Sequence, residues 1–222
     1  MKYRRGVVAA AAAVFVATLS QPASASGWGA TWLMDEPAGS TRMWDSSGNG
    51  HTGTLHTGVH AVGDGTYRFT GRGTVTVPDA PGLDPGSRDF RFEARVRMTG
   101  GYADPNLMQK GYFGTRGGQW KMDYWHGWGF CKFIGSEATR SVRVGYRLAD
   151  GNWHTIICEK RAHWVSISVD PGTSHSKFNR LWGTVGSISN GAPVSIGGKS
   201  YCPSHRCDLF TGYMSFAGVR LL

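Results

Sequence analysis

The chain has 222 residues, among them 33 glycines and nine tryptophans, with 24 lysines and arginines against 15 acidic residues. The formal charge of +9 falls to +6 without residues 1–25, which hold three basic residues and no acidic one. The remaining basic residues are scattered rather than clustered, which argues against a nucleic-acid-binding groove and for a protein with no nucleic-acid partner.

The first residues have the form of a secretory signal peptide. Basic residues near the start precede an apolar run over residues 7–19, and Ala23-Ser24-Ala25 offers a small-x-small cleavage site. An uncleaved membrane anchor is the alternative, but the run is shorter than the roughly 20 residues of a membrane span. We therefore expect residues 1–25 to be removed, and residues 26–222 to form one secreted, extracellular domain without stable membrane insertion.

Most of the remaining chain is predicted to form short β-strands separated by glycine and proline. Residues 90–98 give the clearest pattern, because Phe, Ala, Val and Met alternate there with Arg and Glu. Two further alternations follow the turn residues Asp150-Gly151, within the stretch that ends at Asp170. This pattern is typical of an all-β sandwich or barrel. Further strands are expected at residues 28–34, 67–70, 74–77, 107–110, 120–124, 130–134, 141–148, around 188–196, and at 210–222, the last near the first.

Four motifs occur in an order that resembles the laminin G-like branch of the concanavalin A-like jelly rolls. They are Trp44-Asp45-Ser46-Ser47-Gly48-Asn49-Gly50, the proline-containing stretch 77–90, residues 106–111, and Asp150-Gly151-x-Trp153-His154 with Val169-Asp170. The resemblance implies a two-sheet antiparallel jelly-roll sandwich. It also implies binding or adhesion more often than catalysis.

Two positions depart from the family pattern. Pro171 follows Val169-Asp170 where the family has glycine, and Ser215 in the last strand stands where an acidic residue is common. The second difference removes a carboxylate that would otherwise be a candidate for a role in metal binding or in the sheet.

The loop from Asp45 to Gly53 is a candidate calcium site. Ca²⁺ takes six to eight oxygen ligands, many of them backbone carbonyls, and this loop offers Asp45, Asn49 and flexible glycines. The family resemblance favours calcium here. The alternative is that Asp45 and Asn49 only form the side-chain-to-backbone hydrogen bonds of a tight turn.

The four cysteines suit a secreted protein. The resemblance implies a disulfide between Cys131 and Cys158. Cys202 and Cys207 enclose a short loop that a local disulfide would close. A zinc site at Cys202, His205 and Cys207 is the alternative, although the second pair of ligands usual in such sites is missing.

The densest aromatic cluster is the candidate ligand-binding site. Flat rings with polar neighbours suit sugar stacking, and a break in the alternation at residues 125–129 predicts a hairpin loop that exposes part of the cluster. The alternative is that these rings fill the core. The candidate ligand-binding residues are Trp120, Asp123, Tyr124, Trp125, His126 and Trp128.

Catalysis is the less favoured interpretation. A glycoside hydrolase needs two carboxylates close together, yet no glutamate has a second acid two positions away on the same strand face. Glu93 lies among arginines, where ion pairing is expected. Neither a Gly-x-Ser-x-Gly nor a His-Glu-x-x-His motif occurs.

The sequence thus predicts a secreted, monomeric, non-catalytic carbohydrate-binding protein, lectin-like and calcium-dependent if the Asp45 loop holds the ion. Its expected partner is a glycan or a cell-surface ligand. The alternatives are a protein–protein adhesion module, and a glycoside hydrolase or polysaccharide lyase.

Overall fold

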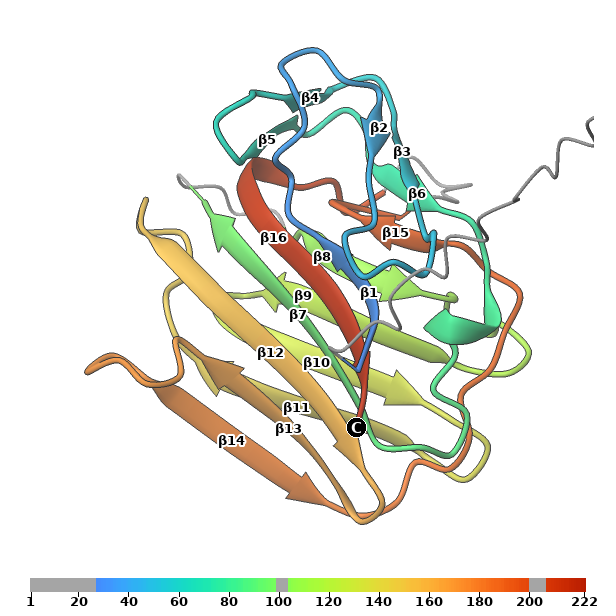
Figure 1. Cartoon of the computed structure of the whole chain (residues 1–222). Helices are drawn as coiled ribbons and strands as arrows, with labels where there is room; N and C mark the ends of the chain where they lie inside the picture. Colours follow the sequence, from blue (N-terminus) through green and yellow to red (C-terminus); the bar gives the residue numbers. More distant parts are fainter. Residues whose placement is uncertain (1–26, 99–103, 200–206) are drawn as a thin grey trace, which may run out of the picture.

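The computed structural model describes residues 27–98, 104–199 and 207–222, which form two antiparallel β-sheets packed face to face (Figure 1). The expected signal peptide lies outside the described residues. Within the described part each sheet has eight strands, so the predicted all-β, two-sheet sandwich is confirmed.

The first sheet contains the strand that the sequence predicted most clearly, β7 (Phe90–Arg97), near its middle. On β7 the alternate residues Phe90, Phe92, Ala94 and Val96 are buried against the second sheet. In sheet order the strands are β14 (Lys177–Trp182), β13 (Trp164–Val169), β12 (Trp153–Arg161), β7, β16 (Thr211–Leu221), β5 (Tyr67–Thr70) and β4 (Val59–Ala61), with β1 (Trp28–Trp32) paired to β16.

The second sheet carries the aromatic segment. In sheet order its strands are β11 (Thr139–Gly145), β10 (Trp128–Ile134), β9 (Gln119–Trp125), β8 (Asn106–Lys110), β15 (Val194–Ile196), β6 (Val75–Val77), β3 (Gly53–Leu55) and β2 (Arg42–Met43). A 3-10 turn, η1 (Pro81–Leu83), lies between β6 and β7.

The disulfide Cys131–Cys158 joins the two sheets through the core. Cys131 lies in β10 and Cys158 in β12, both fully buried, with their Cα atoms 5.8 Å apart. The pairing that the resemblance implied is therefore confirmed. Cys207 is also disulfide-bonded, which excludes it as a zinc ligand, whereas Cys202 and His205 lie outside the described residues.

The sequence did not predict β14. Its six residues, Lys-Phe-Asn-Arg-Leu-Trp, show no strict apolar alternation, and every one of them is exposed. The strand forms because its backbone pairs with β13 at the end of the sheet. There β14 also contacts β11, the end strand of the other sheet, so that one side of the sandwich is closed (Figure 1).

The last strand lies where the sequence placed it. β16 pairs with β1, and Ala217 lies opposite Trp32 in that pair. The predicted strand at residues 141–148 is shorter and begins earlier, as β11, and the short strands β2, β3 and β4 were not predicted. These strands are only two or three residues long, too short to show a clear alternation in the sequence.

Candidate functional site

The predicted hairpin loop between β9 and β10 is a two-residue turn. His126 and Gly127 both have positive φ angles, 47° and 83°, as the tight turns that join two antiparallel strands require. The backbone N–H of His126 donates a hydrogen bond to Asp104 Oδ1 at 2.8 Å, which fixes the turn from outside. The turn therefore leaves both strands regular up to their ends.

Trp125 and Trp128 are direct cross-strand partners on the outer face of the second sheet. Their side chains remain 39% and 40% exposed, so each indole presents a face to solvent. The guanidinium of Arg143, on β11, lies 5.1 Å from the ring centre of Trp128 and 6.0 Å from that of Trp125. We call Trp125, Trp128 and Arg143 the tryptophan platform.

Trp120 and Tyr124 lie on the opposite face of β9, within the core. Trp120 is fully buried, with its ring centre 4.6 Å from that of Phe92, and Tyr124 is 7% exposed. Neither ring can reach a ligand on the outer face. Trp120 and Tyr124 therefore fill the interior of the sandwich, which was the alternative interpretation of the aromatic cluster.

Asp123 belongs to the outer face of β9 but is only 6% exposed. Its Oδ2 accepts an ion-pair contact from Lys121 Nζ at 2.7 Å, while its Oδ1 is buried without a hydrogen-bond partner. Burial raises the pKa of Asp123 to about 6, although the Lys121 ammonium acts in the opposite direction. Asp123 lies two residues before Trp125, near the turn of the hairpin, and its burial leaves it little contact with solvent.

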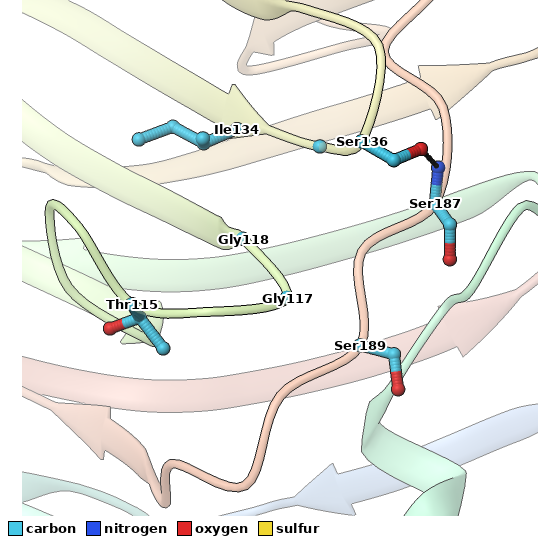
Figure 2. Close-up of a pocket in the computed structure, with 8 residues that line it drawn as sticks. Thr115, Gly117, Gly118, Ile134, Ser136, Ser187 and Ser189 are labelled. Atoms are coloured by element: carbon cyan, nitrogen blue, oxygen red, sulfur yellow. Dashed lines mark hydrogen bonds between the residues drawn. The ribbon is translucent and has the colours of Figure 1, made fainter.

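The other end of the same hairpin borders a cavity of about 340 Å³. Figure 2 shows that three loops meet there, and that Ser187 donates its backbone N–H to Ser136 Oγ, at 2.9 Å. Because β9 runs for seven residues, the cavity and the tryptophan platform lie about 20 Å apart. Apart from Ile134, the residues that line the cavity are small: Thr115, Gly117, Gly118, Gly135, Ser136, Ser187 and Ser189.

The Asp45 carboxylate is fully occupied by hydrogen bonds from the protein. Oδ1 accepts from the backbone N–H of Thr31 at 3.0 Å and of Ser47 at 2.9 Å, while Oδ2 accepts from the Ser47 hydroxyl and the His51 N–H, both at 2.9 Å. Burial acts to raise the pKa of Asp45, but these bonds outweigh it and the pKa is lowered. In this conformation the donor set suits a turn, and it does not offer Ca²⁺ a free carboxylate.

Asn49 also acts as a donor at this loop, with Nδ2 3.0 Å from the Gly29 carbonyl oxygen. Among the described residues, no group of three or more His, Cys, Asp or Glu side chains is arranged to hold a metal ion. The predicted calcium site at Asp45 and Asn49 therefore stays a prediction.

His154 of the Asp150–Asp170 motif lies between two carboxylates. Nδ1 is 2.7 Å from Asp170 Oδ2 and Nε2 is 2.9 Å from Asp150 Oδ1, with His154 only 3% exposed. Burial disfavours the charged ring, but both carboxylates outweigh it and raise the pKa of His154. Both ring nitrogens are engaged, so the cluster fastens the start of β12 to the end of β13.

Sequence reasoning missed the arginines. Arg143 completes the tryptophan platform, and its distance in the sequence from Trp125 hides the contact. The only available signal was its position in an alternating strand. Within the described part of the chain, no helix is long and apolar enough to cross a membrane.

Comparison with known proteins supports the architecture. Residues 132–217 match the family model described as the laminin G domain. No curated protein matches the chain. The structure resembles mouse laminin alpha1 chain, domains LG4-5, with a TM-score of 0.55 and 14% identity, covering 72% of this chain and 43% of that one.

Two further likenesses are to the binding domain of botulinum neurotoxin DC. In its complex with rat synaptotagmin II, the TM-score is 0.64 at 9% identity, with 87% of this chain and 48% of that one covered. In its complex with SialylT, the TM-score is 0.58 at 8% identity, and the match covers 80% of this chain and 45% of that one. The chain thus spans under half the length of these structures, and at such identities the likeness concerns the fold. The Cys131–Cys158 disulfide is typical of extracellular proteins. Residues 132–217 thus resemble a laminin G domain in sequence, and the fold resembles that of the laminin alpha1 domains LG4-5.

Proposed function

We propose that the domain binds carbohydrate without cleaving it, and that the tryptophan platform is the binding surface. The observation that carries the proposal is the cross-strand pair of Trp125 and Trp128, two half-exposed indoles held at the end of a regular hairpin. Sugars present C–H faces that pack on such rings.

Polar groups at the edge of the platform supply hydrogen bonds for sugar hydroxyls. Arg143 offers donors beside both indoles, and the exposed His126 ring lies 3.5 Å from Asp104 at the tip of the turn. Because the hairpin is regular and the turn is fixed by Asp104, binding would cost little ordering of the backbone. Asp123 is too buried to contact the sugar directly, and in this proposal it stays paired with Lys121 below the platform.

The proteins of similar fold support a binding role, either for carbohydrate or for protein. The botulinum neurotoxin DC binding domain was solved with SialylT and also with rat synaptotagmin II. An adhesion module that binds protein is therefore the second candidate function. The observation that favours it is a set of exposed apolar side chains away from the platform, of which Phe113 is 87% and Trp182 67% exposed.

A glycan array with wild type, Trp125→Ala and Trp128→Ala tests the proposal. Trp44→Ala is the matched control, since Trp44 is 57% exposed and lies outside the platform. Each platform variant should bind about five- to tenfold more weakly, as expected for loss of one aromatic contact of about 1–1.5 kcal/mol. Melting temperatures should stay close to wild type because the removed rings are half exposed.

Two results would count against the proposal. If Trp44→Ala weakens binding as much as Trp128→Ala does, the platform is not the site. If wild type binds no glycan but captures a defined protein ligand, the adhesion function replaces it.

A further inference from the structure

The outer face of the first sheet carries exposed aromatic rings at its β14 end. Phe178, Arg180 and Trp182 alternate along β14, and Phe178 and Trp182 are 55% and 67% exposed. Trp164, the cross-strand partner of Trp182, extends the same face onto β13. Exposed aromatic rings gathered on one face in this way are typical of a surface that contacts a ligand or a partner.

Pairing of another strand along the free edge of β14 is blocked. The Asn179 side chain occupies that edge, because its Oδ1 accepts the Arg180 N–H at 2.8 Å while its Nδ2 donates to the Arg143 carbonyl at 2.7 Å. A second copy of β14 would also add its own Lys177 and Arg180 to the same edge, without an acidic residue on the strand to offset the positive charge. The rings are therefore available across the face of the sheet rather than at its edge.

Arg180 lies among three of these rings. Its guanidinium carbon is 4.4 Å from the ring centre of Trp164, 5.3 Å from that of Phe178 and 5.5 Å from that of Trp182. Such cation–π contacts hold the planar guanidinium while leaving its N–H groups able to donate.

A second arginine–aromatic cluster lies on the same face, where β12, β7 and β16 run side by side. Arg97 lies 5.2 Å from the ring centre of Trp153 and 4.5 Å from that of Tyr213, and its buried Nε has no hydrogen-bond partner. Arg95 lies 4.7 Å from Trp153 and donates to Ser215 Oγ at 3.0 Å. Ser215, which stands where the family commonly has an acid, thus leaves this cluster positively charged.

The charge of the two clusters is not balanced within the protein. In the described part of the chain, no ion pair involves Arg95, Arg97 or Arg180. By contrast, Arg91 and Arg161 of this face are paired, Arg91 with Glu93 and Arg161 with Asp89 and Glu159. The free guanidinium groups are complementary to a ligand that carries negative charge at intervals.

The strand register sets the separation of the clusters. Arg180 lies in the same cross-strand row as Arg91, while Arg97 lies six residues further along β7. Six residues span about 20 Å along a strand, and the three strand spacings from β7 to β14 add about 14 Å across the sheet. Small side chains, Ser166 and Ser168 on β13 and Thr155 on β12, lie between the clusters.

We propose that this face binds an acidic polysaccharide, with carboxylates of separate sugar units paired to Arg180 and to Arg97. Planar carboxylates match the two-pronged geometry of a guanidinium, and the flanking rings can stack on the same sugars. The inference goes beyond the proposed function, because it concerns a different face and a charged ligand. A polymer that reaches both clusters binds more tightly than a short fragment that reaches only one.

The test compares binding to immobilised polygalacturonate and to its fully methyl-esterified form, which keeps the backbone but not the charge. Wild type should bind only the acid form, more weakly as salt is raised. Arg180→Ala and Arg97→Ala should each weaken binding about tenfold, and Arg180→Lys should weaken it by less. Arg72→Ala, which removes an equal charge from an exposed turn, is the matched control and should bind like wild type.

Three outcomes would overturn the inference. They are equal binding to the methyl ester, equal losses in Arg72→Ala and Arg180→Ala, and binding to anionic phospholipid vesicles without binding to polygalacturonate. Melting curves establish that each variant is folded. Trp128→Ala separates the two sites, because it should leave polygalacturonate binding unchanged even if it abolishes binding at the tryptophan platform.

Discussion

Asn179 on β14 donates a side-chain hydrogen bond to the carbonyl of Arg143 on β11 at 2.7 Å, and so links the end strands of the two sheets. Arg143 belongs to the tryptophan platform on one outer face, while Arg180, next to Asn179, belongs to the arginine cluster on the other. A single contact at the closed side of the sandwich therefore connects the elements that carry both proposed surfaces.

Asn179→Ala should lower the free energy of unfolding by about 0.5–1 kcal/mol, because the Arg143 carbonyl and the Arg180 N–H exchange this exposed partner for water. It should also raise the tendency to aggregate, since the edge of β14 becomes free for pairing. Urea denaturation and light scattering measure the two effects. Unchanged stability and unchanged scattering would show that the edges are held together by other contacts.

Removing the Cys131–Cys158 disulfide should destabilise the domain by about 3.5 kcal/mol in the chain-entropy model, given the sequence separation of 27 residues. Chemical denaturation of the double variant Cys131→Ala/Cys158→Ala measures this loss in the free energy of unfolding. A loss below about 1 kcal/mol would mean that strain in the native bond offsets the entropic gain.

Asp45→Asn should destabilise the domain by about 2–3 kcal/mol, because the amide accepts the bonds from Thr31, Ser47 and His51 less well than the carboxylate does. The folded-state pKa of Asp45 is lowered, so its stabilisation is present above the ordinary pKa of about 3.8 and is lost as the pH falls. The melting temperature in calcium and in chelator is measured for both proteins. Because the carboxylate is already occupied by hydrogen bonds, each protein should melt at the same temperature in calcium as in chelator. A wild-type melting temperature that is higher in calcium, with no such increase in Asp45→Asn, would establish the metal site.

His154 should titrate above its ordinary pKa, since Asp170 and Asp150 stabilise the charged ring. Because the folded-state pKa is raised, the stabilisation is full below pH 6.5 and is lost as the pH rises through the folded-state pKa. His154→Phe should therefore cost more stability at pH 6 than at pH 9. A cost independent of pH, or an NMR titration of His154 below pH 6, would contradict this assignment.

Asp123 should titrate near pH 6 in a carboxyl-selective NMR experiment, because burial disfavours its charge. This raised folded-state pKa makes Asp123 favour folding at low pH. That contribution declines between about pH 4 and 6, the interval between its ordinary and folded-state pKa values. Lys121→Met removes the neighbouring ammonium and should raise the midpoint further. A midpoint near 4 in wild type would show that water reaches the carboxylate.

The alternation of β7 and of the β12–β13 pair was enough to predict the sheets, since one buried face imposes a period of two. The same rule cannot say which face of β9 points inward. Trp120 and Trp125 were therefore equal candidates for ligand binding until the structure showed which of them is exposed. Arg143 and Arg180 could not be assigned from the sequence, because the rings they contact lie on strands brought together only by sheet pairing.

The most direct measurement of the central proposal is an NMR titration of the nine tryptophan indole N–H signals with the glycan that binds most tightly in the array. The signals of Trp125 and Trp128 should shift as the site saturates, while those of the buried Trp120 and the distant Trp44 should stay in place. Saturable binding that shifts only Trp164 and Trp182, or that shifts no indole signal, would contradict carbohydrate binding at the tryptophan platform.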